Sequence, residues 1–512
     1  MGQLGFGFQC AAKDAEERDQ VFEDELFLDA ESHELFVGAQ RLEAYLDDNG
    51  LGWVVRLAAL LKELDYSAFA RAYQPTGRRA LHPRVMLGLV VYGILSRQWS
   101  LRELESLARR DVGAWWICGG HQPDHSTIGK FIQLHAELLS EEFFVGLVKS
   151  LIGKLRLAPG IVAGDGTVIE AAASHYRSLR AEAVIESGRE AQAASAASPH
   201  DAELARRAAL AQHAAALAEE RSYTRGRHGF PGGVVLSPLE PEAVVQPRKD
   251  GVRRPSYKPT AMVHEAGLIV GQHVDPSSER VSVKPMLEQH TAAFGGIPAT
   301  VLLDAGFASL AVLGLMMESE IDVLCPTGRA VGEEDWQRRD SHRGMFSKQA
   351  FRYLPEQDVY RCPACRELRP GWRSIDRFGR RYRVYLADSC DSCQLRDQCT
   401  TSSHGRMVRR YQGDDLKDLM AAVLSHPAAR AKYRRRHAIV EPCFAQLRER
   451  QGLRRFHRRG LAAVRVEFAL HCIAFNLKKA VGPLFQLLVL LVRLPKQPRR
   501  VLGVIALTGS NY

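Results

Sequence analysis

Two apolar segments of this chain each end on an aspartate that is followed by a turn of small residues. One runs from Ile161 to Asp165 and Gly166, and the other, "ATVLLDAGF", reaches Asp304. Short apolar runs bounded by glycine predict buried strands. Because functional groups gather where adjacent strands end, and glycine permits close approach there, we expect both aspartates to face one site. Two carboxylates at one site repel each other unless a cation lies between them, which favours Mg²⁺ or Mn²⁺ as hard, oxygen-binding ions.

A third acid, Glu441, lies in the arginine-rich segment 431–460, directly before Pro442. Since the residue before a proline avoids the α region, we expect a helix to kink or start there, with Glu441 at its entrance. Arg448, seven residues further on, returns to the same helical face. The three acids therefore predict a three-carboxylate metal site beside arginines that hold phosphates.

The charge of the chain favours a nucleic-acid partner. Its 512 residues carry a formal net charge of +10, and a basic balance suits a polyanion. Segment 76–155 predicts a helical module, with Pro83 opening one helix, a capping box at Ser100 and Glu103, and a third helix capped at or just after Asp124. Three short helices joined by tight turns are a common DNA-binding architecture, and a plain helical bundle is the alternative.

Neither a signal peptide nor a membrane span is predicted. The first twenty residues lack a basic segment followed by an apolar core. The longest apolar run, Leu487–Val492, is far too short to cross a bilayer and predicts a helix packed on the core. We therefore expect a cytoplasmic protein with reduced thiols and no membrane partner.

The ten cysteines then need an explanation other than disulfides. Five of them form two CxxC pairs and one further position: Cys362, Cys365, Cys390, Cys393 and Cys399. In a reduced compartment this spacing predicts a structural Zn²⁺ ribbon, with Cys399 or His404 as an alternate fourth ligand, and thiols without metal are the alternative. The remaining cysteines have no partner pattern and are predicted to be buried: Cys10, Cys118, Cys325, Cys443 and Cys472.

Several ordered motifs resemble the bacterial insertion-sequence transposases of the DDE type. "DGTVIEA" is similar to the first-aspartate motif of that family, "LLDAGF" to the second, and "YRRRHAIVEPCFAQLR" to its Tyr–Arg–Glu–Lys helix signature. The stretch from "LHPRVMLGLVVYGILSRQWSLRELE" to "PDHSTIGKF" resembles the helical N-terminal domain common in these enzymes. The resemblance covers roughly residues 75–180 and 255–480.

The resemblance implies an α/β fold with an RNase H-like catalytic core, a mixed sheet flanked by helices. An all-α N-terminal DNA-binding domain and a Cys-rich insertion accompany the core. The expected parts are an N-terminal helical extension (1–75), the helical DNA-binding domain (76–155), the first part of the core (156–310) with an Ala-rich helical insert (181–222), an insertion with the zinc ribbon (311–425), core helices carrying the glutamate (426–482) and a C-terminal tail (483–512). Pro199 and Asp201 could start the long helix of the Ala-rich insert.

The resemblance also assigns roles to single residues. Asp165, Asp304 and Glu441 match the catalytic triad that binds Mg²⁺. The positions implied in DNA-phosphate binding are Tyr433, Arg434, Arg436, His437 and Arg448. Arg436 lies one residue farther from Glu441 than the usual spacing, so Arg434 or His437 could share its role, and Arg448 stands where lysine is usual. Glu170 is the leading substitute if the triad is misassigned.

The implied reaction is DNA transposition by two-metal phosphoryl transfer. The enzyme would bind the terminal inverted repeats of its element, cleave there with water, and transfer the freed 3′-OH ends to target DNA. Double-stranded DNA is the partner, and joining two ends implies a homodimer in the synaptic complex. Two alternatives remain: a non-catalytic DNA-binding regulator of element ends, and an RNase H-like nuclease without strand transfer. The presence of all three acids favours an active enzyme.

Overall fold

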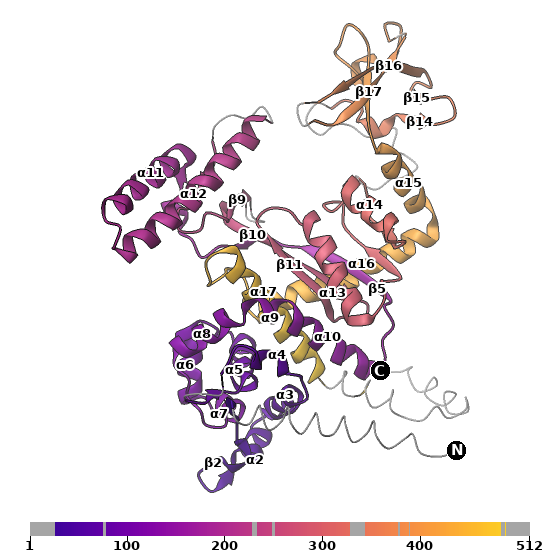
Figure 1. Ribbon diagram of the computed structural model, residues 1–512. Helices are drawn as coiled ribbons and strands as arrows, with labels where there is room; N and C mark the ends of the chain where they lie inside the picture. The colour runs from indigo at the N-terminus through magenta and orange to yellow at the C-terminus, as the bar shows by residue number, and fades with distance from the viewer. Residues whose placement is uncertain are drawn as a thin grey trace, which may run out of the picture.

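The structure is a computed structural model that describes residues 26–487, except 75–77, 228–232, 248–250, 328–343, 377–378, 389 and 483–486. Figure 1 shows a helical N-terminal body, a central sheet with its helices, and two parts that project away from it. Cys10 and all of the predicted C-terminal tail except Leu487 lie outside the described residues. None of the described helices is long and apolar enough to cross a membrane.

The N-terminal body is helical, and its caps are those that the sequence predicts. Pro83 opens α5 after the N-cap His82, and Ser100 and Glu103 form the capping box of α6. Asp124 caps α8 by accepting a hydrogen bond from the Thr127 backbone at 2.7 Å. The helices of this body are α2 (Leu42–Asp48), α3 (Gly52–Lys62), α4 (Ser67–Ala70), α5 (Pro83–Leu95), α6 (Leu101–Arg110), α7 (Val112–Cys118), α8 (His125–Leu134), α9 (Ala136–Ser140) and α10 (Glu142–Leu155). Short strands accompany them: β1 (Phe27–Leu28) pairs with β4 (Ala80–Leu81), and β2 (Phe36–Val37) with β3 (Gln40–Arg41).

A mixed sheet forms the centre of the molecule, with the strand order β11-β10-β5-β12-β13. Its strands are β5 (Ile161–Gly166), β10 (Arg253–His264), β11 (Ile269–Asp275), β12 (Thr300–Leu302) and β13 (Asp322–Leu324), and β6 (Ile169–Glu170) and β9 (Val244–Pro247) also pair with β10. The long strand β10 is antiparallel to both β11 and β5. The strands β5, β12 and β13 run parallel to one another, so their carboxyl ends share one edge.

Four helices accompany the sheet: α13 (Val283–Phe294), α14 (Leu310–Glu318), α16 (Pro427–Ala445) and α17 (Leu461–Ala480). Helix α17 packs against β11 of the sheet and against α5 and α9 of the N-terminal body. It is buried along almost its whole length because apolar residues occupy nearly every face. The side chain of Asn476 makes two hydrogen bonds to the backbone of Ile269, at 2.8 and 2.9 Å, and so fixes α17 to β11.

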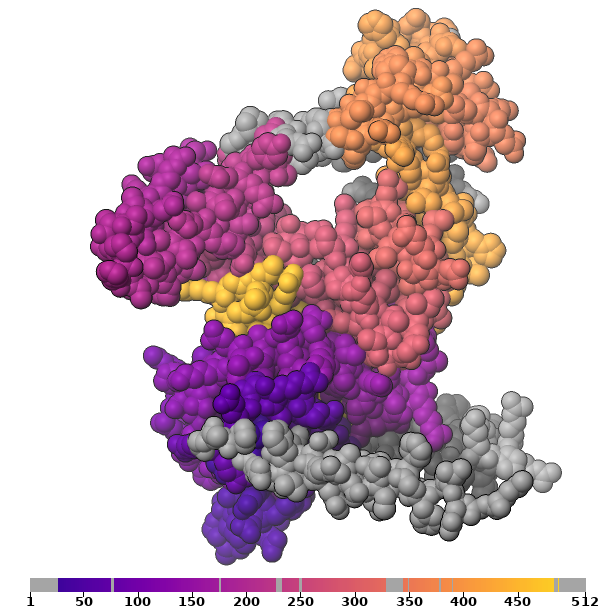
Figure 2. Space-filling view, viewed as in Figure 1, coloured from indigo at the N-terminus to yellow at the C-terminus, as the bar shows by residue number. Residues whose placement is uncertain are grey.

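The first projecting part is a helical hairpin. Helices α11 (Ala181–Ala197) and α12 (Ala202–Arg227) pack along each other, and β7 (Leu179–Arg180) pairs with β8 (Val235–Leu236) at their base. Gly188 of α11 lies against Ala211 and Ala215 of α12, so the small residues allow close approach. Asp201 accepts hydrogen bonds from the backbone at the start of α12, as the sequence suggested for this residue. Figure 2 shows open space between this hairpin and the second projecting part.

The second projecting part is a five-stranded antiparallel sheet with its own small apolar core. It comprises β14 (Arg352–Leu354), β15 (Val359–Arg361), β16 (Glu367–Ile375), β17 (Arg381–Ala387) and β18 (Met407–Tyr411). The insertion that the sequence placed at 311–425 begins later in the structure. Helix α14 and strand β13 belong to the central unit, because β13 pairs in parallel with β12.

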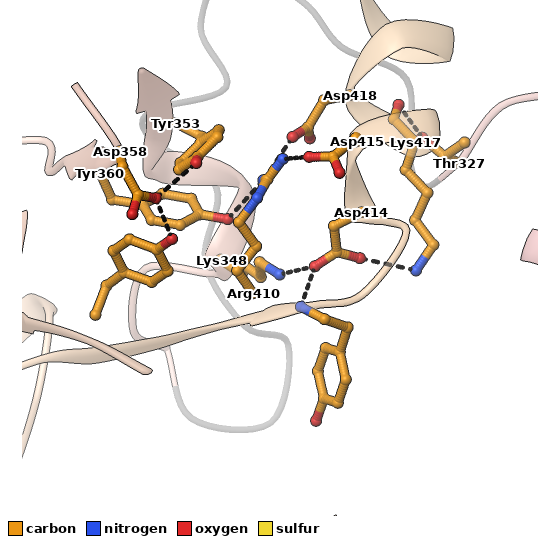
Figure 3. Close-up of polar contacts among 12 residues, drawn as sticks. Thr327, Lys348, Tyr353, Asp358, Tyr360, Arg410, Asp414, Asp415, Lys417 and Asp418 are labelled. Atoms are coloured by element: carbon orange, nitrogen blue, oxygen red, sulfur yellow. Dashed lines mark hydrogen bonds and ion pairs between the residues drawn. The ribbon is translucent and has the colours of Figure 1, made fainter. Parts of the chain in front are cut away.

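A cluster of polar contacts joins this outer sheet to α15 (Asp414–Ser425), the helix that leads back to the central unit (Figure 3). Arg410 of β18 is buried, lies over the ring of Tyr353 at 3.6 Å and pairs with Asp418 at 2.7 Å. Asp414 at the start of α15 accepts from Lys348 at 2.6 Å and from the backbone of Tyr411 at 2.8 Å. The outer sheet and α15 are therefore held together by charge pairs in which one partner, Arg410 or Asp414, is buried.

A buried acid lies between the N-terminal body and α17. The side chain of Glu467 is almost fully enclosed and accepts from the Trp99 indole at 3.4 Å and from the backbones of His457 and Arg458, each at 2.9 Å. Burial raises the pKa of Glu467 to about 7. Because the folded protein holds this proton more tightly than the unfolded chain, this contribution to stability is full at low pH and is lost as the pH rises through about 7.

We expect Glu467→Gln to reveal this effect. Between about pH 5 and about pH 8, the unchanged protein should lose about 2–3 kcal/mol of stability relative to the variant, since the glutamine cannot ionise. The measurement is the melting temperature of both proteins across that pH range. A difference that stays constant with pH would show that Glu467 does not titrate in this window.

Candidate active site

The two predicted aspartates lie at the same edge of the central sheet. Strands β5 and β12 run parallel with Ala163 opposite Leu302, so the next two residues of each chain lead to Asp165 and Asp304. In each turn a glycine backbone donates to the aspartate: Gly166 to Asp165 at 3.0 Å, and Gly306 to Asp304 at 2.8 Å. The pairing of distant strands thus brings the two carboxylates together.

Glu441 lines the same cleft as the two aspartates. The cleft has a volume of about 1060 Å³. Its lining residues are Asp165, Gly166, Thr167, Val168, Ile169, Pro247, Lys258, Glu279, Asp304, Glu441, Phe444, Ala445, Arg448, Glu449 and Arg454. Three acids that are far apart in the sequence therefore share one concave surface, together with three basic side chains.

A buried arginine lies between the aspartates. Nη2 of Arg436 is 3.0 Å from Asp165 Oδ1 and 3.6 Å from Asp304 Oδ2, and it donates to the carbonyl oxygen of Gly164 at 3.0 Å. The Arg436 side chain is only 7% exposed, whereas those of Asp165 and Asp304 are 27% and 38% exposed. Arg436 contacts both aspartates because α16 crosses the sheet with this residue turned inward, and its predicted contact with phosphates stays a prediction.

The electrostatics of Asp165 favour the binding of a cation. Burial raises the pKa of Asp165, the neighbouring charge of Asp304 raises it further, and Arg436 opposes both effects. The charge of Arg436 therefore does not fully offset the effect of burial on Asp165. A further positive charge would stabilise the ionised form of Asp165.

Glu441 lies in the last turns of α16 and not at a helix entrance. Its carboxylate is 66% exposed and lies 2.7 Å from Nδ1 of His437, one turn earlier. The prediction that a helix starts at Pro442 is wrong, because α16 runs through this residue before a π-helix follows at Gln446–Arg450. The alternative of a kink at Pro442 stays a prediction. Burial of the neighbouring Cys443 and Phe444 offsets the hydrogen bond that the proline cannot donate.

The other residues of the signature differ in their exposure. Arg434 is exposed, and Arg448 is half-buried in the cleft wall, where burial lowers its pKa and the charge of Asp165 opposes that shift. Tyr433 is partly buried against the apolar core, and burial raises its pKa. Of these residues, Arg448 is the one that lines the cleft beside the acids.

Glu170 is placed away from the acids. It is buried, its carboxylate lies 3.3 Å from Arg254, and it is not among the residues that line the cleft. Its position fits the structural role that the sequence suggested and gives no support to its use as a substitute for Glu441.

The charged cleft residues that the sequence analysis did not single out include Glu279 and Lys258. Glu279 ends the turn "DPSSE" after β11, and Lys258 lies within β10. Nζ of Lys258 is 2.9 Å from Oε2 of Glu279, and both side chains are mostly buried. No local motif marks either residue, because their proximity to the aspartates depends on how β10, β11 and β5 pair.

The predicted zinc cysteines lie in the outer sheet. Four of them, Cys362, Cys390, Cys393 and Cys399, line a small cavity, and Cys365 is exposed. Burial raises the pKa of the Cys399 thiol to about 11. Within the described part of the chain, no three His, Cys, Asp or Glu residues are arranged as a metal-binding group. Zinc at these cysteines and a cation at Asp165, Asp304 and Glu441 therefore both stay predictions.

The remaining described cysteines are buried, as predicted. Cys118, Cys325, Cys443 and Cys472 are enclosed in the main apolar core. They therefore behave as small apolar side chains, and burial raises the pKa of each thiol.

Two family models match this chain. Residues 41–134 match a transposase domain (DUF772), and residues 361–481 match a transposase DDE domain. Both matched segments are thus similar to transposase domains, and each covers less than half of the chain. Together the two matches indicate an insertion-sequence DDE transposase. The second match spans Glu441 and strands β16 to β18 of the outer sheet, and the first spans most of the N-terminal helical body. No curated protein and no solved structure gave a match.

Proposed function

We propose that this chain cleaves DNA at the terminal inverted repeats of its insertion sequence and transfers the resulting 3′-OH ends to target DNA. The observation that carries the proposal is that Asp165, Asp304 and Glu441 line one cleft although they come from distant segments. The sheet supports an RNase H-like core, since its mixed strand order places Asp165 on the central strand and Asp304 beside it.

The residues of the cleft fit divalent cations. Asp165, Asp304 and Glu441 would hold Mg²⁺ or Mn²⁺, which prefer carboxylate oxygens. The contact of Arg436 with both aspartates supports this assignment, because the pair already attracts a positive group. The Thr167 hydroxyl is buried at the cleft without a hydrogen-bond partner in the described structure, and it could bind a water of the ion's hydration shell. When bound, such ions activate the attacking oxygen and stabilise the leaving oxygen of an in-line phosphoryl transfer.

Basic side chains on the cleft wall would position the DNA backbone. Arg448, Arg454 and Lys258 line the cleft together with the acids. Arg448 lies near enough to Asp165 for their charges to interact, so it would hold a phosphate next to the reacting one. The helical body at 76–155 would bind the inverted repeats, and two copies of the chain would bring the two ends together.

The proposed reaction uses one site twice. In the first step an oxygen of water bonds to the phosphorus at the element end, the P–O3′ bond breaks, and the freed 3′-oxygen takes up a proton. In the second step that 3′-oxygen loses its proton and bonds to a phosphorus of target DNA, the target's P–O3′ bond breaks, and the leaving 3′-oxygen takes up a proton. In both steps Asp165, Asp304 and Glu441 would hold the divalent cations that compensate the phosphate charge. Arg448 would orient the neighbouring phosphate.

A strand-transfer assay tests the proposal. The full chain is incubated with Mg²⁺, a labelled duplex that carries one terminal repeat of its element, and a target plasmid. We expect 3′-OH cleavage products and joined products. Cleavage without joining would indicate a nuclease, and binding without cleavage would indicate a regulator of element ends. Either result would contradict the proposed transposition.

A further inference from the structure

The carboxylate of Glu279 lies beside both aspartate turns. Glu279 is at the end of the turn that joins β11 to the short helix before α13, and its side chain is 16% exposed. A Cβ atom added to Gly166 would lie 3.0 Å from Oε2 of Glu279. A Cβ atom added to Gly306 would overlap Oε1 of Glu279 and would lie 3.0 Å from Oδ1 of Asp304. The carboxylates of Glu279 and Asp304 thus approach the same point above Gly306.

These contacts give a reason for the glycines that follow the two aspartates. Gly166 lies in extended backbone within β5, and Gly306 is not in the left-handed region, so neither is required by its φ angle. A side chain at either position would displace the Glu279 carboxylate. The small residues therefore keep space for a third acidic group beside Asp165 and Asp304.

Neighbouring groups hold Glu279 in this position. Lys258 pairs with Oε2 at 2.9 Å, and Nε of Arg280 donates to the carbonyl oxygen of Gly306 at 2.8 Å. The second contact ties the Glu279 turn to the Asp304 turn. Lys258 supplies one positive charge for the carboxylate, as Arg436 does for the two aspartates.

An unpaired hydroxyl lies at the same place. Thr260 of β10 is fully buried, and its Oγ1 has no hydrogen-bond partner in the described structure. The Cβ position of Gly166 is 3.4 Å from this hydroxyl and 3.0 Å from Oε2 of Glu279. A buried polar atom without a partner is costly, and such atoms usually bind water or a ligand.

We propose that Glu279 is a fourth carboxylate of the metal site. It would accept hydrogen bonds from the hydration shell of the cation held by Asp165 and Asp304, and the Thr260 hydroxyl would bind the same shell. Glu279 is a positioning residue in this assignment, and Lys258 is its counter-ion in the metal-free protein. This inference rests on the proposed function of the cleft.

Metal affinity tests the inference without depending on activity. Mn²⁺ binding to the full chain is measured by isothermal titration calorimetry for the unchanged protein and for Glu279→Gln. We expect the variant to raise the Kd for Mn²⁺ about tenfold, because groups that support metal ligands typically have effects of this size. Glu449→Gln is the matched control, since Glu449 lines the same cleft but pairs with Arg454 at the surface, and its Kd should be unchanged.

Two further variants distinguish a wrong inference about Glu279 from a wrong assignment of the metal site itself. Asp165→Asn should lose Mn²⁺ binding at the cleft. If Asp165→Asn loses binding while Glu279→Gln keeps the unchanged Kd, the inference about Glu279 is wrong and the proposed site stands. If both variants bind as the unchanged protein does, the proposed site itself is wrong. Glu279→Asp keeps the charge but shortens the side chain, and its intermediate Kd would support positioning even if Glu279→Gln did not fold.

Discussion

Replacing Asp165 by asparagine should slow Mg²⁺-dependent DNA cleavage by at least about a thousandfold, with binding of the element ends within about twofold of the unchanged protein. Asparagine has nearly the same size as aspartate but carries no charge. It therefore cannot balance the charge of a cation held beside Asp304. Among the described residues, none that lines the cleft comes from the helical body that we propose as the end-binding part. Cleavage is measured on labelled duplexes that carry an element end, and binding is measured by electrophoretic mobility shift.

Glu449→Gln is the matched control for this experiment. Glu449 lines the same cleft as Asp165, but its carboxylate is exposed and pairs with Arg454. We expect this variant to cleave within about twofold of the unchanged protein. Full cleavage by Asp165→Asn, or an equal loss in Glu449→Gln, would exclude a special role for Asp165.

Replacing Arg436 by alanine should destabilise the metal-free protein by about 3 kcal/mol. The substitution leaves Asp165 and Asp304 without the buried guanidinium between them, and the Gly164 carbonyl loses its donor. Added Mg²⁺ should recover part of the loss, because the cation would compensate the same two carboxylates. Melting temperatures in EDTA and in Mg²⁺ measure both effects.

Arg435→Ala provides the comparison for Arg436→Ala. Arg435 is the preceding residue of α16, but its side chain is 50% exposed and pairs with Glu265 at the surface. Its removal should cost less than about 1 kcal/mol and should leave the response to Mg²⁺ unchanged. If Arg436→Ala melts like Arg435→Ala in EDTA, Arg436 does not compensate the two aspartates.

The sequence predicted the acids of the cleft because their signals are local. Apolar runs that end at Asp165 and Asp304 mark strand ends, and parallel pairing of those strands was sufficient to bring the two residues together. Glu441 was identified from its resemblance to a helix signature. The caps at Ser100 and Asp124 were likewise predictable, since each depends on residues within one turn.

The incorrect or missing predictions concern contacts between distant segments. The inward orientation of Arg436 depends on how α16 crosses β5, and the approach of Glu279 depends on the pairing of three strands. The continuation of α16 through Pro442 depends on the burial of Cys443 and Phe444 in the apolar core, which a local rule for proline does not include. The boundary of the insertion was misplaced because β13 has only three residues, too few to give a clear pattern.

The junction between the outer sheet and α15 has a mechanical consequence for the acid on α16. Charge pairs of the buried Arg410 and Asp414 join the sheet to α15, and His426 is the single residue between the end of α15 and the start of α16. We therefore expect a rotation of the outer sheet to carry α15 with it and to change the angle at which α15 meets α16, the helix that carries Glu441. The outer sheet and the Glu441 carboxylate are therefore connected through α15, His426 and α16.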